Sequence, residues 1–125
     1  MSAKINIHHT EDVTVLEVSG QLVLGEAGVT FHNSVQNALE SATKKLIVDM
    51  GGVDYMDSSG LAEFIHAHTS AKSRGCVVKL ARLTRKLDSL MQITRLSTVF
   101  DFYPDEVEAV AAFSHPQPAV GETAF

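Results

Sequence analysis

Apolar residues near the start of the chain recur at every second position, the spacing typical of half-buried strands. Ile5 and Ile7 alternate with polar neighbours, and after a short polar break a second apolar stretch runs from Val13 to Ser19-Gly20. Two strands separated by so few residues predict an antiparallel hairpin.

Strand-like runs then alternate with helix-like stretches. Residues 46–50 are apolar except for Asp49, as expected of a central strand covered on both faces, and residues 76–81 and 97–103 predict two further strands. Apolar residues spaced three and four apart predict four helices. Their apolar stripes are Phe31, Val35, Ala38, Leu39 and Ala42; Leu61, Phe64, Ile65, His68 and Ala71; Leu83, Leu87, Leu90 and Met91; and Val107, Val110 and Ala111.

Glycines, prolines and charges indicate where these elements end. The pair Gly51-Gly52 predicts a turn at the end of the third strand. Lys44-Lys45 is expected at the carboxyl end of the first helix, where cations suit the helix dipole, and Gly75 just after the second helix. Pro104 is expected at the first position of the last helix, followed by acidic residues.

The predicted order is β-β-α-β-α-β-α-β-α, which indicates an α/β fold. Strands that alternate with helices imply a mixed, mostly parallel sheet with right-handed crossovers, here with an N-terminal hairpin. The chain shows no internal repeat and no linker, so one domain is expected over residues 1–113. Residues 114–125, which include two prolines and a glycine, are expected to form a frayed tail.

Composition limits the classes of function. With 125 residues, 45% of them hydrophobic and 20% charged, the chain is expected to be an ordinary soluble globular protein. The net charge of -5 argues against nucleic acid as the main partner. Cys76 is the only cysteine, so no disulfide framework is expected, which fits a reducing cytoplasm. Neither a signal peptide nor a membrane-spanning stretch is evident.

Four basic residues lie close together in the sequence without interleaved aromatic residues: Arg82, Arg85, Lys86 and Arg95. Nucleic-acid surfaces usually combine a basic patch with a recognisable binding motif, which this segment lacks. The cluster is therefore interpreted as a solvated helix face or as a surface that docks another protein.

The stretch Asp57-Ser58-Ser59-Gly60-Leu61 joins the third predicted strand to the second predicted helix. A polar turn between a strand and a helix lies at the carboxyl edge of the sheet, where sites in open α/β sheets tend to occur. Asp57 is expected to cap the helix, with Ser58 and Ser59 in its first turn. The serines could be ordinary capping residues or could include a phosphate acceptor, and the local sequence leaves both interpretations open.

Catalytic interpretations of this turn find little support. His66 lies eight residues after Ser58, about 12 Å along a helix, which is too far for it to act directly as a base. The serines are not in a G-x-S-x-G motif, and Gly51-Gly52 lacks the lysine of a phosphate-binding loop. Asp49 stands where a receiver domain would carry its acceptor, but no acidic pair follows the first strand. No catalytic activity and no cofactor are expected.

Metal-ligating patterns are also weak. His66 and His68 are two apart on a predicted helix and His8 and His9 are adjacent on a predicted strand, so neither pair shares a face. His68 is expected in or near the core. The carboxylates of three residues could converge on Mg²⁺: Asp49, Asp54 and Asp57. The sequence indicates no phosphate ligand that would share the ion with them. No metal site is expected.

A phosphoryl group at the start of the second helix would be well held, because backbone N–H groups are free there and the helix dipole is positive. Asp54 and Asp57 would repel the added charge of about -1.5 to -2. Like charges brought together across an interface oppose binding by about 3 kcal/mol, roughly a hundredfold in affinity. Phosphorylation is thus expected to switch a binding surface without rebuilding the fold.

Residues 46–61, LIVDMGGVDYMDSSGL, resemble the signature of the STAS domain, and more specifically that of the bacterial anti-sigma-factor antagonists. Gly20-Gln21-Leu22, Gly75 before a strand and the segment 96–100 agree with the same family, and the resemblance covers residues 4–113. It implies the STAS fold and a protein that binds a partner without catalysing a reaction.

In this family the first serine after the aspartate is phosphorylated by the anti-sigma factor, itself a serine kinase, and a serine phosphatase reverses the modification. The resemblance implies that Ser58 is this acceptor and that the unmodified protein captures the anti-sigma factor, which frees a sigma factor. Gly60 is expected to let a partner backbone approach closely. The implied partner-binding surface comprises Val23, Asp54, Asp57, Ser58, Ser59 and Gly60.

One position departs from the family pattern, since many antagonists carry an acidic residue after the Gly-x-Leu segment, where this chain has Val23. The alternative function is a STAS interaction subunit of a larger signalling or lipid-transport assembly, in which the Asp57-Ser58-Ser59 turn docks a partner and is never modified. Both functions imply a cytoplasmic protein without direct binding to nucleic acid or membrane.

Overall fold

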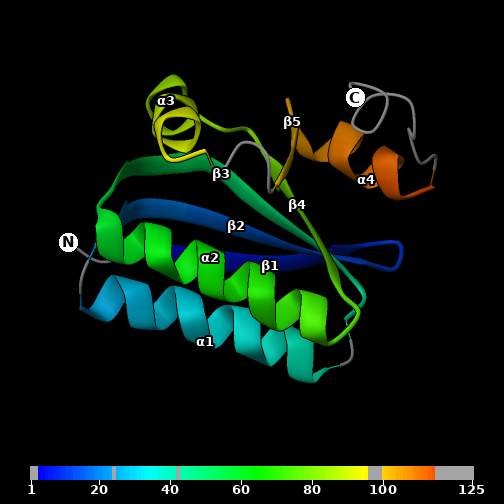
Figure 1. The fold of residues 1–125 in the computed structure, drawn as a ribbon. Helices are drawn as coiled ribbons and strands as arrows, with labels where there is room; N and C mark the ends of the chain where they lie inside the picture. Colours follow the sequence, from blue (N-terminus) through cyan, green and yellow to red (C-terminus); the bar gives the residue numbers. More distant parts are fainter. Residues whose placement is uncertain (1–2, 24, 42, 96–99, 115–125) are drawn as a thin grey trace.

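The computed structural model describes residues 3–23, 25–41, 43–95 and 100–114, which form a five-stranded sheet and four helices (Figure 1). The elements follow in the predicted order. They are β1 (Lys4–Thr10), β2 (Val13–Leu22), α1 (Glu26–Glu40), β3 (Lys45–Met56), α2 (Ser58–Ser73), β4 (Val77–Ala81), α3 (Arg85–Ile93), β5 (Asp101–Tyr103) and α4 (Glu106–Ser114).

The strands lie in the sheet in the same order as in the chain, from β1 at one edge to β5 at the other. β1 and β2 are antiparallel, with Ile7 opposite Leu16, and the other neighbouring strands are parallel. A tight turn can join an antiparallel pair, whereas each parallel pair needs a longer connection that returns the chain to the same end of the sheet. The predicted mixed, mostly parallel sheet with an N-terminal hairpin is therefore confirmed.

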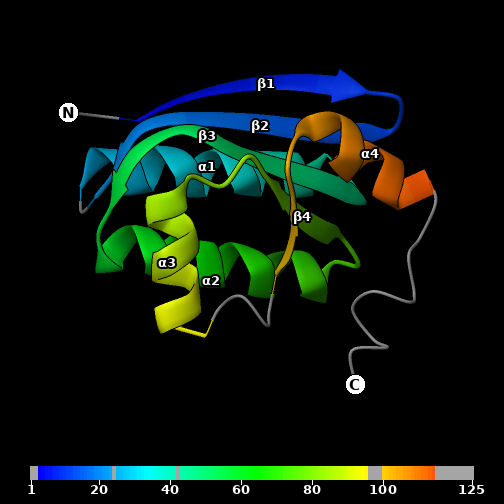
Figure 2. The same ribbon diagram turned by 90° about the horizontal axis from the view of Figure 1, so that it is seen from above.

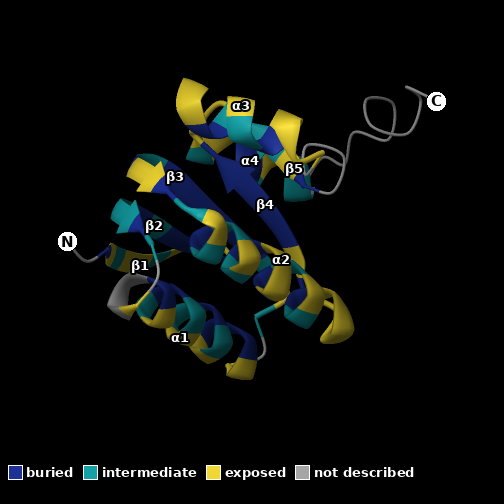
Figure 3. Ribbon diagram, turned by 60° about the vertical axis from the view of Figure 1, so that its left-hand side comes forward, coloured by how far each residue is buried: buried dark blue, intermediate teal, exposed yellow. Residues whose placement is uncertain are grey.

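Helices cover both faces of the sheet (Figures 1 and 2). α1 and α2 lie side by side on one face, while α4 packs over β3, β4 and β5 on the other. The main core fills the space under α1 and α2, where the buried rings of Phe31 and Phe64 have centroids 4.6 Å apart. A smaller cluster, which includes Val15, Ile47 and Ala109, lies under α4. Buried residues accordingly line the inner sides of the helices (Figure 3).

β3 continues through Gly51 and Gly52 to Met56, so the turn predicted at the glycine pair is wrong. Both positions have close neighbours where a side chain would lie: atoms at or near the backbone of Ser19 at Gly52, and the guanidinium that Arg82 directs at Asp49 at Gly51. A Cβ on Gly51 would lie 2.5 Å from Cζ of Arg82, and one on Gly52 would lie 2.7 Å from Cβ of Ser19. The strand therefore passes two close neighbours and reaches α2 with only Asp57 in between.

α1 runs from Glu26 to Glu40, so it ends before the predicted end at Lys44-Lys45. Its last turn carries no basic residue, so the predicted role of Lys44-Lys45 at the helix end is wrong. Lys44 Nζ instead donates a hydrogen bond to the Arg74 carbonyl at 3.1 Å, and Lys45 pairs with Asp12 at 2.8 Å.

The ends of the other helices agree partly with prediction. Gly75 has φ +73° immediately after the C-cap of α2, which confirms its predicted place. The Glu108 N–H donates to Asp105 Oδ1 at 2.8 Å, so Asp105 caps α4 and Pro104 precedes the cap rather than opening the helix. β5 is shorter than the predicted strand 97–103, of which residues 97–99 lie outside the described part. The tail over residues 115–125 lies outside it too, and the domain boundary at 113 stays a prediction.

Candidate functional site

The turn from β3 into α2 is held by hydrogen bonds on both sides of Asp57. Its carboxylate accepts a hydrogen bond from the Gly60 N–H at 3.0 Å, and its backbone N–H donates to the Leu22 carbonyl at 3.1 Å. Asp57 is therefore the N-cap of α2, as predicted, because its extended backbone and its side-chain oxygen fit that position. The end of β2 anchors the same turn.

Ser58 is the first residue of α2 and is exposed. The first N–H groups of a helix lack intrahelical partners, and the helix dipole is positive there. The first turn of α2 carries no acidic residue of its own. A negative group added to Ser58 would thus meet a favourable local field, and the hydroxyl is accessible to another protein. Asp54 is also exposed, on β3 shortly before the cap.

Ser59 is half-buried and borders a hollow of about 230 Å³ between α1 and α2. Residues from the β2–α1 connection and from both helices line this α1–α2 hollow: Val23, Gly25, Gly28, Val29, Ser59 and Glu63. Val23 is half-buried, while Val29 is 58% exposed. Val23 and Ser59, far apart in the sequence, therefore belong to one surface beside the start of α2.

Gly60 is buried, and the backbone that comes close to it is that of the same chain. A Cβ at this position would meet the Leu22 carbonyl oxygen at less than any ordinary contact distance and Met56 Cγ at 2.9 Å. The absence of a side chain at Gly60 thus lets α2 begin directly against the end of β2. Its expected contact with a partner stays a prediction.

Gly60→Ala is expected to destabilise the protein by about 2 kcal/mol, because a backbone oxygen cannot move aside as a flexible side chain can. Gly28→Ala is the matched control, since its Cβ would lie 3.6 Å from the nearest atom, the Val23 carbonyl oxygen, and alanine favours a helix. Chemical denaturation measures both free energies of unfolding. Equal stability of the two variants would contradict the close packing described for Gly60.

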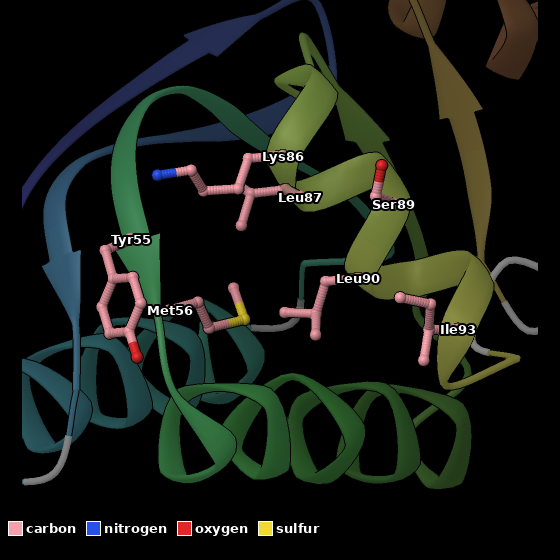
Figure 4. Close-up of a pocket in the computed structure, with 7 residues that line it drawn as sticks. All are labelled: Tyr55, Met56, Lys86, Leu87, Ser89, Leu90 and Ile93. Carbon is pink, nitrogen blue, oxygen red and sulfur yellow. The ribbon is translucent and has the colours of Figure 1, made fainter.

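A second hollow, the β3–α3 groove, lies between the end of β3 and one side of α3 and has a volume of about 340 Å³ (Figure 4). It is lined by Tyr55, Met56, Lys86, Leu87, Ser89, Leu90 and Ile93. Tyr55 is 47% and Ile93 80% exposed, so the groove carries apolar area that is open to solvent. Local sequence patterns did not predict this groove; the one signal for it is that Ile93 falls outside the predicted apolar stripe of its helix.

The model of the STAS domain family matches residues 4–109. The chain belongs to the STAS domain family. An anti-sigma-B factor antagonist of Bacillus subtilis is 27% identical over 101 residues, which span 81% of this chain and 91% of that protein. The protein of the same name from Listeria monocytogenes is 35% identical over 83 residues, 63% of this chain and 73% of its own length.

Solved structures share the fold of this STAS domain. A protein of Thermotoga maritima superposes with a TM-score of 0.82 at 20% identity, covering 89% of this chain and 95% of its own. An anti-sigma-factor antagonist domain protein of Planctomyces limnophilus gives a TM-score of 0.74 at 23% identity, covering 88% and 97%. These likenesses confirm the fold predicted from the sequence.

Asp49 of the STAS signature is 1% exposed and faces α4, on the side of the sheet away from α2. Nε of Arg82 donates to both carboxylate oxygens, at 2.9 and 3.0 Å, and the Gly51 N–H donates to Oδ1 at 2.9 Å. Burial acts to raise the pKa of Asp49, but hydrogen bonds from Glu106, Gly51 and Arg82 outweigh it and lower the pKa. Arg82, whose own side chain is 53% exposed, therefore pairs with a buried carboxylate and is not simply part of a solvated helix face.

Glu106 joins this network at the start of α4. Hydrogen bonding to Asp49, then burial, then Glu17 raise the pKa of Glu106 to about 8. Nε2 of His8 lies 3.1 Å from Glu106 Oε1 and 3.2 Å from Glu17 Oε2. The carboxylates thus share one site in which Asp49 stays ionised beside Arg82 while Glu106 keeps its proton.

Stability is expected to fall as the pH rises through the window between the unfolded pKa of Glu106, 4.5, and its folded pKa of about 8. The folded chain retains this proton above pH 4.5 whereas the unfolded chain loses it, so protonation stabilises the fold at low pH and ceases to do so near pH 8. Glu106→Gln mimics the protonated side chain and should flatten this decline in a series of melting temperatures. Exposed Glu108→Gln is the control, and parallel curves for Glu106→Gln and wild type would contradict the prediction.

The structure separates most of the other predicted candidates. The clusters of possible metal ligands within the described residues are His8–Glu17–Glu106 and His32–Glu63–His66, so Asp49, Asp54 and Asp57 do not converge as a magnesium site. The ring of His66 stacks on His32 at 5.3 Å, and that of His68 meets Phe100 edge-on at 5.0 Å, which confirms its place beside the core. Among the helices of the described segments, none is long and apolar enough to cross a membrane.

Proposed function

We propose that this STAS domain is a cytoplasmic anti-sigma-factor antagonist that is switched off by reversible phosphorylation of Ser58. In the unmodified state it binds an anti-sigma factor that is also a serine kinase, and a serine phosphatase restores that state. The domain is a substrate and a binding protein without catalysis of its own. The observation that carries the proposal is the exposed Ser58 at the first position of a capped helix.

Relatives support the class of partner. The Bacillus subtilis protein that is 27% identical is an anti-sigma-B factor antagonist. The antagonist SpoIIAA, whose structure in the phosphorylated form gives a TM-score of 0.69 at 16% identity, shows that a protein of this fold can carry a phosphate. The same protein in its unphosphorylated form also gives a TM-score of 0.69. The fold is thus compatible with both states of the proposed switch.

The surface around Ser58 has the features that a charge-controlled interface needs. Asp57 and Asp54 already supply negative charge beside the acceptor, so a phosphate would concentrate charge on a small area. Val23 and the α1–α2 hollow offer apolar contact next to it. The unmodified surface can therefore bury apolar area against the anti-sigma factor, and the phosphorylated one would bring uncompensated charge into that interface.

The test is phosphorylation of the purified chain by a candidate anti-sigma kinase with ATP, read by mass spectrometry of the intact protein and of its peptides. Wild type and Ser59→Ala are expected to gain one phosphate, on Ser58, whereas Ser58→Ala gains none. Absence of phosphate on Ser58 with every kinase encoded beside a sigma factor in the same genome would overturn the switch.

The β3–α3 groove favours a second candidate function, that of a STAS interaction subunit of a larger signalling or lipid-transport assembly. Exposed Tyr55 and Ile93 provide apolar area that does not depend on phosphorylation. Co-purification from the source cell separates the two functions, because a histidine-kinase-like ATPase supports the antagonist and a transporter ATPase supports the subunit.

A further inference from the structure

The outer side of the α1–α2 helix pair carries two histidines and a glutamate that face one another. Glu63 and His66 are three residues apart on α2, so they share one face of that helix. His32 comes from α1, which lies beside α2. One donor atom from each of the three side chains lies within 4.8 Å of the other two.

The spacing of these atoms fits a shared metal ion. Ligand distances of about 2.0–2.2 Å in a tetrahedral zinc site place neighbouring donor atoms about 3.3 Å apart. His32 Nδ1 lies 3.1 Å from Glu63 Oε1, and the rings of His32 and His66 are nearly parallel, with an angle of 11° and centroids 5.3 Å apart. Side-chain rotation alone can therefore bring all three donors to one ion.

The donor set determines the class of ion. Two imidazoles and one carboxylate suit Zn²⁺ and neighbouring divalent transition metals, whereas Ca²⁺ and Mg²⁺ prefer oxygen ligands only. The side chains of His32 and Glu63 are 35% and 31% exposed, so an ion can enter from solvent and keep water in a further position.

We propose that His32, Glu63 and His66 form a binding site for a divalent transition-metal ion of the zinc class, which links α1 to α2. Glu63 also lines the α1–α2 hollow together with Ser59, so the proposed site adjoins that hollow. The site is independent of the proposed phosphorylation, because none of its ligands takes part in that reaction.

The second cluster, His8–Glu17–Glu106, is the less suitable one and serves as an internal control. It offers one imidazole instead of two, and Glu106 is already hydrogen-bonded to Asp49 and Glu17, close to the positive charge of Arg82. A cation there would compete with an existing ion pair, whereas the ion-pair partner of Glu63 is His32, which is itself one of the proposed ligands.

The test is isothermal titration of the full chain, purified without a histidine tag, with ZnCl₂. One Zn²⁺ per chain is expected, with a higher melting temperature in its presence. His32→Gln and His66→Gln should each weaken binding more than about tenfold, while His8→Gln leaves it unchanged. Co²⁺ should bind with a visible absorption band that the first two variants lose, which separates ligation from a change in fold.

Three results would overturn the proposal. They are absence of saturable Zn²⁺ binding, binding unchanged in both His32→Gln and His66→Gln, and binding lost only in His8→Gln. Ser58→Ala should bind Zn²⁺ as wild type does, so failure of the metal site and failure of the phosphorylation switch can be told apart. Circular dichroism of each variant confirms that the chain is folded, and exposed His66 is the position where folding is least at risk.

Discussion

Ser58→Glu is expected to weaken binding of the anti-sigma factor about a hundredfold while leaving the melting temperature nearly unchanged. A carboxylate placed beside Asp57 and Asp54 brings like charges into the proposed interface, which opposes binding by about 3 kcal/mol. The fold itself tolerates the change because Ser58 is exposed and a negative group is favoured at a helix N-terminus. Titration calorimetry measures the affinity, and thermal unfolding measures the stability.

Ser58→Gln is the matched control, since glutamine has the size of glutamate without its charge. It should bind within a few-fold of wild type, and the difference between the two variants should shrink as salt screens the charges. Equal affinities for the glutamate and glutamine variants would show that the surface does not discriminate by charge, and the electrostatic switch would then be wrong.

Arg82→Ala is expected to lower the free energy of unfolding by about 2 kcal/mol at neutral pH, since it removes the hydrogen bonds that Arg82 donates to the buried Asp49 carboxylate. Because the Arg82 side chain is 53% exposed, water replaces part of the lost interaction. Arginine and alanine both carry a Cβ atom, so the backbone strain at φ +56° is the same in wild type and variant. The backbone therefore contributes little to the difference in stability. The loss should be smaller at acid pH, where Asp49 can take up a proton and become neutral. Urea unfolding of wild type and Arg82→Ala at several pH values measures this loss of unfolding free energy.

Two variants separate the charge of Arg82 from its shape. Arg82→Lys should recover part of the stability, because an ammonium supplies the charge but not the planar donor fork. Arg85→Ala, at an exposed position on α3, should change stability by less than about 0.5 kcal/mol. If Arg82→Ala lowered the free energy of unfolding by the same amount at every pH, the role assigned to the Asp49–Arg82 ion pair would be contradicted.

Local patterns sufficed to predict the order of elements and the start of α2. Phe64 and Ala71 of the apolar stripe predicted for α2 do face the core, and that information is contained in a short segment. Two other predicted apolar positions do not, because Ile7 on β1 is 53% and Ile65 on α2 is 45% exposed. The cap at Asp57 is equally local, since its side chain bonds an N–H three residues away. The family signature added the hypothesis for Ser58.

Predictions failed where a local signal was overruled by a distant contact. Gly51-Gly52 resembles a turn, yet the pair lies within β3, where Gly52 is in register with Ser19 of β2 and the absence of side chains leaves room for Ser19 and Arg82. The sequence offers His68, on the same helix, as the metal-ligating partner of His66, whereas the neighbour of His66 in space is His32 on α1. No spacing within one helix could have indicated that pair.

The sequence by itself determined which segments become strands and helices and where a serine follows a capping aspartate, because propensity, periodicity and capping act over a few residues. Only the tertiary structure decided what lies around that turn: the buried contact of Gly60 with Leu22, the hollow that joins Val23 to Ser59 and the groove beside Tyr55. These features depend on how the sheet brings together residues that are far apart in the chain, and the parallel crossovers fix that arrangement only when the whole domain has folded.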